Sequence, residues 1–327
     1  MEKEENERLF EDFPSIHNSA VFLCKLFGKK ITTFGRKRKM KKIRVLIVLV
    51  CVMAAANFAS ADTIRGINID FVTIGNPGNG TDPATGNLYG AVGYNYRIGK
   101  YEVTNAQWNT FTAAAGAPTG NPSEAYNTGA YFTGTQQPTN MVSWYEAAQF
   151  CNYLTSGNKS LGAYQLGTDG SITVDRVAAI SAYGTAYVIP NEDEWYKAAY
   201  YKPNGSGYSL YANGTNTIPA ADNGWNYDGG SYSTPWNVGI GTQEQNGTFD
   251  MMGNVRELNE SPTFGSYRGL RGGSYYDYEY FLRSSYRFDF KPYFESTDVG
   301  FRVAEIPEPA SLVLLFLGGL VLRNRKR

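Results

Sequence analysis

The chain has 327 residues, of which 42% are hydrophobic, and this is enough to bury one sizeable core. Of its 30 Lys and Arg residues, 12 precede Asp62 and 4 follow Glu305, whereas the same two segments hold 6 and 1 of its 30 Asp and Glu residues. The stretch between them therefore has 14 basic and 23 acidic side chains, a net charge of about −9, which excludes nucleic acid as an expected partner.

Met40 opens a segment, "MKKIRVLIVLVCVMAAANFASAD", with the three parts of a secretory signal peptide. It has a basic start, an apolar middle and a small-residue cleavage site at Ala59-Ser60-Ala61. We therefore expect residues 1–39 to be a leader before the true start, residues 40–61 to be removed, and the protein to be exported. The alternative is a cytoplasmic tail before a membrane anchor, but the apolar run is shorter than the ~20 residues that a span needs.

Residues 62–305 form the predicted domain, and no internal repeat divides it. The alternation in "INIDFVTIG" predicts a strand over 67–75, and "NYRIGKYEVTNAQWNTF" predicts a strand followed by a helix capped by Thr104. Two further helices are predicted by capping boxes. One begins at Ser143 with Glu146, and the other begins at Asn191 with Glu194, after a strand that ends at Pro190.

Cys151 is the only cysteine of residues 62–305, and the only histidine, His17, precedes them. No internal disulfide and no metal site of paired thiolates is therefore possible in the domain. Cys151 falls among the apolar positions of the second predicted helix. Because a reactive thiol needs an activating neighbour, we expect Cys151 to be a buried core residue.

The carboxyl end reads "IPEPASLVLLFLGGLVLRNRKR" and resembles the PEP-CTERM sorting tail, which exosortase handles in bacteria. A Pro-Glu-Pro triplet precedes a short apolar run, Ala310 to Leu322, and a basic tip. The run is short for a stable span, and the cations would hold its end on the cytoplasmic side. We expect residues 306–327 to be a sorting segment with transient membrane association, which would deliver the protein to the cell envelope or extracellular matrix.

Seven ordered motifs between Ile67 and Ala304 resemble the formylglycine-generating-enzyme, or sulfatase-modifying factor, family. They are "GKYEVTNAQW", "VSWYEAAQFCNYL", "IPNEDEWYKAAYY", "GTFDMMGNVRELNE", "LRGGSYY", "LRSSYR" and "VGFRVA". The resemblance implies a single α+β domain of C-type-lectin-like topology with much irregular structure. It does not by itself supply an activity, because function depends on a site rather than on a fold.

The chemistry of the family's enzymes fails a residue test in this chain. Sulfatase-activating members bind copper through a pair of cysteines between the RGGS-like and GFR-like motifs, and residues 271–302 contain none. Ergothioneine-pathway relatives use histidine-bound iron, and the domain has no histidine. Copper is therefore not expected. Asp277 and Glu279 would share one face of an extended segment, but we favour solvated surface acids over a catalytic pair.

Calcium is the inorganic cofactor that the resemblance leaves open. The family binds calcium around a D-x-x-G-N-x-x-E loop, which matches "DMMGNVRE" here. The implied ligands are Asp250, the carbonyls of Gly253 and Val255, and Glu257, all hard oxygen donors. Asn226 and Asp228 are candidates for a second site. Arg256 stands where the family usually has tryptophan, and we expect it to compete for the same carboxylates; a hydrogen-bonded loop without metal is the alternative.

The stretch after the RGGS motif is the candidate ligand-binding surface. Its residues are Tyr275, Tyr276, Asp277, Tyr278, Glu279, Tyr280, Phe288, Phe290 and Tyr293. Tyrosine supplies a large amphipathic contact area at low entropy cost, so we favour recognition of an extracellular peptide or glycan. A plain aromatic core is the alternative, because alternate residues of a strand point inward.

Three functions follow. The first is an exported binding protein with a catalytically silent domain, the second an oxidase-type sulfatase maturation factor that uses an unrecognised site, and the third a component of an extracellular matrix.

Overall fold

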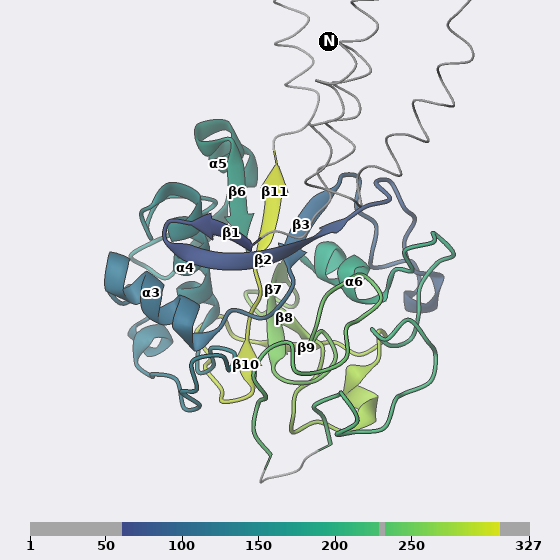
Figure 1. Cartoon of the computed structure of the whole chain (residues 1–327). Coiled ribbons are helices and arrows are strands. Elements are labelled where there is room, and N and C mark those ends of the chain that lie inside the picture. Colours follow the sequence, from purple (N-terminus) through teal and green to yellow (C-terminus); the bar gives the residue numbers. More distant parts are fainter. Residues whose placement is uncertain (1–60, 229–232, 308–327) are drawn as a thin grey trace, which may run out of the picture. The chain divides into compact units, whose positions relative to one another are not determined.

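The structure is a computed structural model that describes residues 61–228 and 233–307 (Figure 1). The predicted leader, the signal peptide up to residue 60 and the sorting segment after residue 307 lie outside the described residues. Ala61, the last residue of the predicted signal peptide, is the first residue of β1 and pairs with Asp70. No helix in the described ranges is long and apolar enough to cross a membrane.

A five-stranded antiparallel sheet joins the first and the last strand of the domain. Its order is β1 (Ala61–Ile64), β2 (Ile67–Ile74), β3 (Tyr96–Gly99), β11 (Ala304–Pro307) and β6 (Thr185–Val188). The guanidinium of Arg97 forms ion pairs with both Asp62 and Glu305, so one side chain connects the two ends of the domain.

The helices begin where side-chain caps satisfy their first backbone N–H groups. They are α3 (Asn105–Ala115), α4 (Trp144–Ser156), α5 (Arg176–Tyr183) and α6 (Glu192–Tyr200), with the short 3-10 helices η2 (Pro83–Thr85), η3 (Ser123–Tyr126) and η5 (Glu279–Leu282). Thr104, Ser143 and Asn191 each complete a capping box. Every residue of α4 except Ser156 is buried, so this helix is a core element on all sides rather than an amphipathic one.

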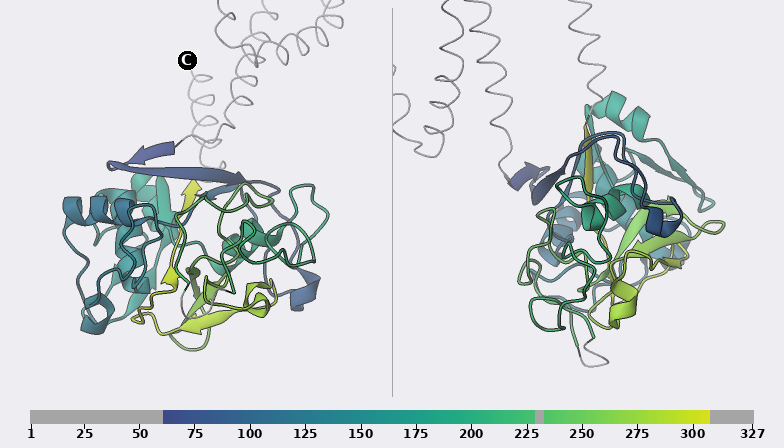
Figure 2. Two further views of the ribbon diagram at one scale, coloured as in Figure 1. Left: turned by 60° about the horizontal axis from the view of Figure 1, so that its bottom comes forward. Right: turned by 90° about the vertical axis from the view of Figure 1, so that its right-hand side faces the viewer.

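A second sheet of four strands carries the sequence motifs of the carboxyl half. Its order is β10 (Val299–Gly300), β7 (Arg256–Pro262), β8 (Arg268–Arg271) and β9 (Phe288–Phe290), and a hairpin of β4 (Tyr164–Leu166) with β5 (Ile172–Val174) stands apart. Strand β10 runs parallel to β7, and the other pairs are antiparallel. Figure 2 shows the long irregular segments gathered on the side of this second sheet, away from α3 and α4.

The predicted elements in the first half of the domain are confirmed, with small differences at their ends. The strand predicted over 67–75 is β2, the helix capped by Thr104 is α3, and the two capping boxes open α4 and α6. The strand before α6 ends at Val188 rather than at Pro190. Cys151 is fully buried in α4, as expected, and burial raises the pKa of its thiol well above the ordinary value.

Candidate functional site

The predicted binding stretch alternates between the interior and the surface. Tyr275 and Asp277 are buried, whereas Tyr276, Tyr278 and Tyr280 are 50%, 64% and 56% exposed. The chain turns between Ser274 and Tyr278, and η5 follows. In the rest of the predicted set, Glu279 is exposed and Phe288, Phe290 and Tyr293 are half-buried. Tyr275 is therefore a core residue, as the aromatic-core alternative predicts. Tyr276, Tyr278 and Tyr280 lie at the surface, where a recognition role requires them.

Asp277 stabilises this turn through hydrogen bonds inside it. Its carboxylate accepts hydrogen bonds from the backbone N–H of Ser274 at 2.9 Å and from the Ser274 hydroxyl at 3.0 Å. Its carbonyl accepts from the N–H of Asp228 at 2.8 Å. Both acids were expected to be solvated surface acids; Glu279 is exposed at the start of η5, but Asp277 is buried, so the expectation is wrong for Asp277. A turn separates the two residues, and the spacing of an extended strand does not apply.

Arg256 lies beneath the turn and pairs with two carboxylates. One guanidinium nitrogen contacts Asp277, and another lies 2.6 Å from a carboxylate oxygen of Asp298. The guanidinium also stands 5.1 Å from the ring centre of Phe288, within the range of a cation–π contact. The expectation that Arg256 competes for the carboxylates of the calcium loop is therefore corrected. Arg256 starts β7, and its side chain reaches the tyrosine turn instead.

A row of aromatic rings continues from the turn along β9. Tyr280 contacts Phe281 at 5.7 Å between ring centres, and Phe281 contacts Tyr286 at 4.8 Å. The row continues from Tyr286 to Phe288 at 6.3 Å, from Phe288 to Phe290 at 5.0 Å, and from Phe290 to Phe294 at 4.3 Å. We call these rings, together with Tyr276 and Tyr278, the aromatic surface. Strand β9 has no partner strand other than β8 in the described residues, so Phe288 and Phe290 lie on an edge strand.

The predicted calcium loop connects the two halves of the domain. Gly253 has a φ of 92°, and a Cβ there would lie 2.3 Å from the carbonyl oxygen of Asn226, so only glycine permits this approach. The carboxamide of Asn254 donates to Glu102 at 2.6 Å and accepts from Asn226 at 3.0 Å. The carboxylate of Asp250 accepts from the N–H of Gly239 at 2.9 Å. The loop is therefore braced by hydrogen bonds from three distant segments.

Glu257, the last predicted calcium ligand, is paired with Arg302 inside the protein. Both side chains are fully buried; the Nε of Arg302 lies 2.6 Å from one carboxylate oxygen, and a second nitrogen contacts the other. The indole N–H of Trp195 donates to Glu257 at 2.7 Å. Burial acts to lower the pKa of Arg302, but the charge of Glu257, the hydrogen bonds to it and the charges of Glu102 and Glu244 together outweigh burial and raise that pKa. Arg302 thus holds the carboxylate that the sequence assigned to calcium.

Further buried acids stand near this pair. Burial and neighbouring carboxylates raise the pKa of Glu102, and burial raises the pKa of Glu244 to about 8 and that of Asp250 to about 6. One carboxylate oxygen of Glu244 is buried without a hydrogen-bond partner. The donor chemistry of hard oxygens and excess negative charge fits calcium. In residues 61–228 and 233–307, however, no cluster of three or more His, Cys, Asp or Glu side chains is arranged to hold a metal. Calcium stays a prediction.

The second predicted metal pair is also engaged in the fold. The carboxamide of Asn226 donates to Asn254 and to the carbonyl of Thr234 at 3.1 Å. The N–H of Asp228 donates to the carbonyl of Asp277, so the segment 226–228 connects the calcium loop, through Asn226, to the tyrosine turn. Asn226 therefore lies close to the Gly253 loop, but the amide nitrogen of its side chain is engaged in hydrogen bonds there.

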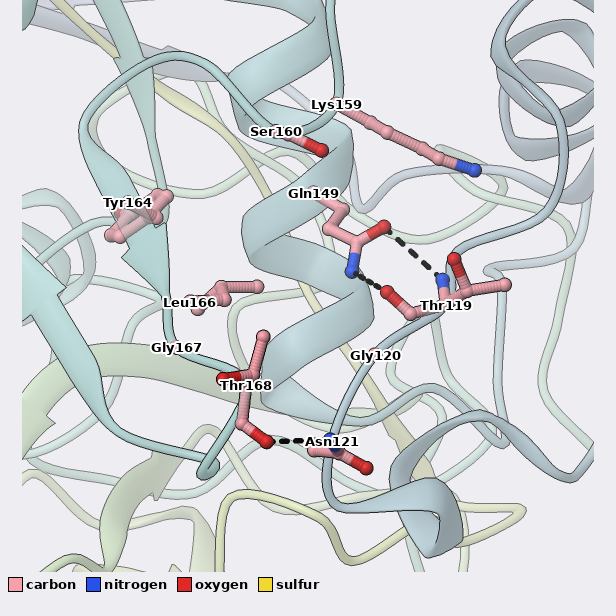
Figure 3. Close-up of a pocket in the computed structure, with 10 residues that line it drawn as sticks. All are labelled: Thr119, Gly120, Asn121, Gln149, Lys159, Ser160, Tyr164, Leu166, Gly167 and Thr168. Carbon is pink, nitrogen blue, oxygen red and sulfur yellow. Dashed lines mark hydrogen bonds between the residues drawn. The ribbon is translucent and has the colours of Figure 1, made fainter.

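A small pocket of about 130 Å³ lies away from the predicted residues, between the loop before η3 and the turn after β4 (Figure 3). Gln149 of α4 fixes one wall, because its carboxamide accepts from the N–H of Thr119 at 3.3 Å and donates to the carbonyl of Thr119 at 2.8 Å. Asn121 crosses to the carbonyl of Thr168 at 2.5 Å. The volume corresponds to only a few water molecules. The pocket was not predicted from the sequence.

The comparisons with known proteins decide the family. Residues 89–306 match the sulfatase-modifying factor enzyme 1-like domain, which is more than half of the chain. The chain belongs to the sulfatase-modifying factor family. The α+β architecture with two curled sheets is the C-type-lectin-like fold of this family, as expected. No curated protein matches the chain.

Three solved structures share the fold of this sulfatase-modifying factor domain. Variable protein 1 of Treponema denticola is 24% identical with a TM-score of 0.55, and the match covers 76% of this chain and 99% of that chain. CarF is 22% identical with a TM-score of 0.53, covering 74% and 99%. PvdO from Pseudomonas aeruginosa is 18% identical with a TM-score of 0.50, covering 76% and 98%. At these identities the likeness shows the fold alone.

Sequence reasoning missed Asp298, Ser274 and Glu102 as members of the polar framework beneath the site. Asp298 is 42 residues from its partner Arg256, and Glu102 is 152 residues from its partner Asn254. No local spacing signals such pairs. The sequence offered one signal for these residues, the number of acids near Gly253-Asn254 and Gly300-Phe301-Arg302, because carboxylates that become buried need hydrogen-bond or ion-pair partners.

Proposed function

We propose that this protein is an exported member of the sulfatase-modifying factor family that binds an extracellular peptide or glycan and does not catalyse the family's oxidation. The observation that carries the proposal is the aromatic surface, in which a row of ring contacts runs from Tyr280 to Phe294 through the edge strand β9, and Tyr276, Tyr278 and Tyr280 are largely exposed. Rigid amphipathic rings give binding area at low entropy cost.

The residue chemistry around this surface supports binding rather than oxidation. The stretch 271–302 contains no cysteine or histidine, and Cys151, the one cysteine of the described ranges, is fully buried in α4. A soft copper site needs thiolate or imidazole ligands. Two acids are adjacent to the exposed tyrosines in sequence: Asp277 is already paired with Arg256 and Ser274, and Glu279 lies 3.6 Å from Arg283.

The ends of the domain support a tethered arrangement. Strands β1 and β11 lie in the same sheet, whereas β9 with its aromatic rings belongs to the other sheet. Figure 1 shows β11 at the top of the domain and β9 below it, nearer the middle. A sorting tail that follows β11 would then begin at the sheet that does not carry the aromatic surface.

The test is a glycan and peptide array probed with the exported protein. We expect binding that falls at least tenfold when Tyr276 and Tyr278 are both changed to alanine. The matched control is Phe264→Ala, an aromatic ring that is 84% exposed outside the aromatic surface, and it should leave binding unchanged. Binding that survives the double substitution would remove the aromatic surface from the proposal.

The oxidase alternative is tested separately. The protein is loaded with copper and given oxygen and a cysteine-containing sulfatase peptide, and formylglycine is sought by mass spectrometry. We expect no turnover. Turnover that persists in Cys151→Ser would establish a site built from residues other than cysteine and would overturn the binding proposal.

A further inference from the structure

The outer face of helix α5 has no charged side chain. The inner side of the helix contributes Ala179 and Ile180 to the core, and the guanidinium of Arg176 turns inward to pair with Glu194 and Glu260. The outward residues are Val177, Ala178, Ser181, Ala182 and Tyr183, all exposed. A helix on the surface of a globular domain ordinarily turns charged and polar residues to solvent. Here Val177 is 78% exposed and Tyr183 is 43% exposed, which leaves an apolar face without a partner in the described residues.

This face lies beside the point where the chain leaves the described fold. Gly184 caps α5, and β6 begins at the next residue, Thr185. Thr185 is the register partner of Pro307, the last residue of β11. The end of β11 lies next to α5 in both Figure 1 and the right-hand view of Figure 2. Whatever follows Pro307 therefore begins at the carboxyl end of α5.

An apolar segment follows within reach. The run "ASLVLLFLGGLVL", Ala310 to Leu322, starts three residues after Pro307. Three residues span up to about 10 Å, and the eight residues of α5 form a helix about 12 Å long, so the start of the run can reach most of the outer face and the residues that follow it can reach the rest. A connection this short gives an effective concentration in the millimolar range or above. A small apolar face is then sufficient to hold the run.

We propose that the outer face of α5, defined by Val177, Ala178, Ser181, Ala182 and Tyr183, is a docking surface for the apolar segment Ala310–Leu322 of the same chain. The contact covers the segment whenever it is not in a membrane, and a membrane competes for it. This contact goes beyond the proposed ligand binding and does not depend on the aromatic surface. A second copy of the chain is disfavoured as the occupant, because it lacks the advantage of a connection three residues long.

The test uses the full chain with the photoreactive residue p-benzoylphenylalanine in place of Val177. After irradiation, we expect cross-linked peptides to contain residues 310–322, with a yield that does not change on dilution. Hydrogen exchange of the α5 backbone is the second measurement. The double variant Leu315→Asp and Leu317→Asp should increase exchange in α5 by about tenfold, because the charged segment no longer covers the helix.

Two controls keep the outcome clear. Ala182→Asp places a charge on the docking surface and should reduce the cross-linking yield, whereas Ala113→Asp, at an exposed alanine of α3, should leave it unchanged. Val177→Leu should keep the slow exchange. Cross-links between differently isotope-labelled copies would replace the proposal with self-association. The docking proposal would be overturned if hydrogen exchange in α5 were the same in the Leu315→Asp, Leu317→Asp variant and in the unaltered chain. Neither result changes what is expected for ligand binding on the array.

Discussion

Arg302 and Arg256 both form ion pairs with carboxylates, and the surroundings of these two arginines differ. Arg302 is fully buried, pairs with Glu257 and donates to the backbone carbonyls of Gly99 and Phe249. Arg256 is slightly exposed, pairs with Asp277 and Asp298, and has a buried Nε without a hydrogen-bond partner. Arg302 serves the core architecture, whereas Arg256 supports the turn that presents the tyrosines. An arginine thus stabilises the buried core at position 302 and a surface turn at position 256.

The largest change in the free energy of unfolding is expected from breaking the buried Arg302–Glu257 pair. Arg302→Met would leave the carboxylate of Glu257 buried without a cation, and breaking a buried pair costs about 3–5 kcal/mol. Urea unfolding measures the loss. The control is Glu279→Gln, which removes an exposed partner 3.6 Å from Arg283 and should change stability by less than about 1 kcal/mol. If the two variants lost the same free energy of unfolding, the buried Arg302–Glu257 pair would contribute no more to stability than the exposed Glu279–Arg283 pair.

A buried acid without an arginine shows what the arginines contribute. Glu146, at the start of α4, forms no ion pair in the described ranges, and burial together with neighbouring Glu295 raises its pKa to about 8. Its proton is held more tightly in the folded than in the unfolded chain. The stabilisation is therefore complete below about pH 4.5 and is lost as the pH rises toward 8, at up to about 1.4 kcal/mol per pH unit.

Glu146→Gln should remove this part of the pH dependence. The glutamine keeps the shape of the side chain but cannot ionise, so the slope of unfolding free energy between pH 5 and pH 8 should become less steep. Glu257→Gln is the comparison, because it breaks an ion pair instead of removing an uncompensated acid, and it should lower stability throughout that range. A slope that Glu146→Gln leaves unchanged would mean that other groups control the alkaline loss.

Calcium, predicted from the sequence at Asp250 and Glu257, would be a second cation beside Arg302, which already pairs with Glu257. If calcium binds through Asp250, the metal-free protein should gain about 2.7 kcal/mol at a calcium concentration of one hundred times the dissociation constant. Asp250→Asn should abolish the gain, and Asp228→Asn should retain it if the first predicted site is the one that binds. Thermal unfolding with magnesium as the matched ion measures both. No gain with either ion would leave Arg302 as the cation that compensates Glu257.

The sequence predicted local features well and distant pairings poorly. Thr104 was recognised as a helix cap, and Ser143 and Asn191 as the starts of capping boxes, because these signals lie within four residues of chain. The partner of Arg256 was misjudged because the direction of a side chain at the start of a strand depends on the turn and strand that pack beside it. The resemblance supplied the fold, but the alternation of buried and exposed tyrosines depends on the turn at Ser274, which no periodic pattern shows.

The smallest expected loss of stability, and the one closest to function, comes from the second arginine. Arg256→Met keeps an apolar stem under Phe288 but removes charge-assisted hydrogen bonds to Asp277 and Asp298, which are worth about 1.5–3 kcal/mol. The turn that carries Tyr276 and Tyr278 would lose its support, so binding on the array should fall more than stability does. Arg256→Lys, which restores one contact but not the two-sided pairing, should give an intermediate result. If Arg256→Met lost stability but bound ligand as tightly as the unaltered protein, the aromatic surface would be rigid without this arginine, and the contrast with Arg302 would be one of burial alone.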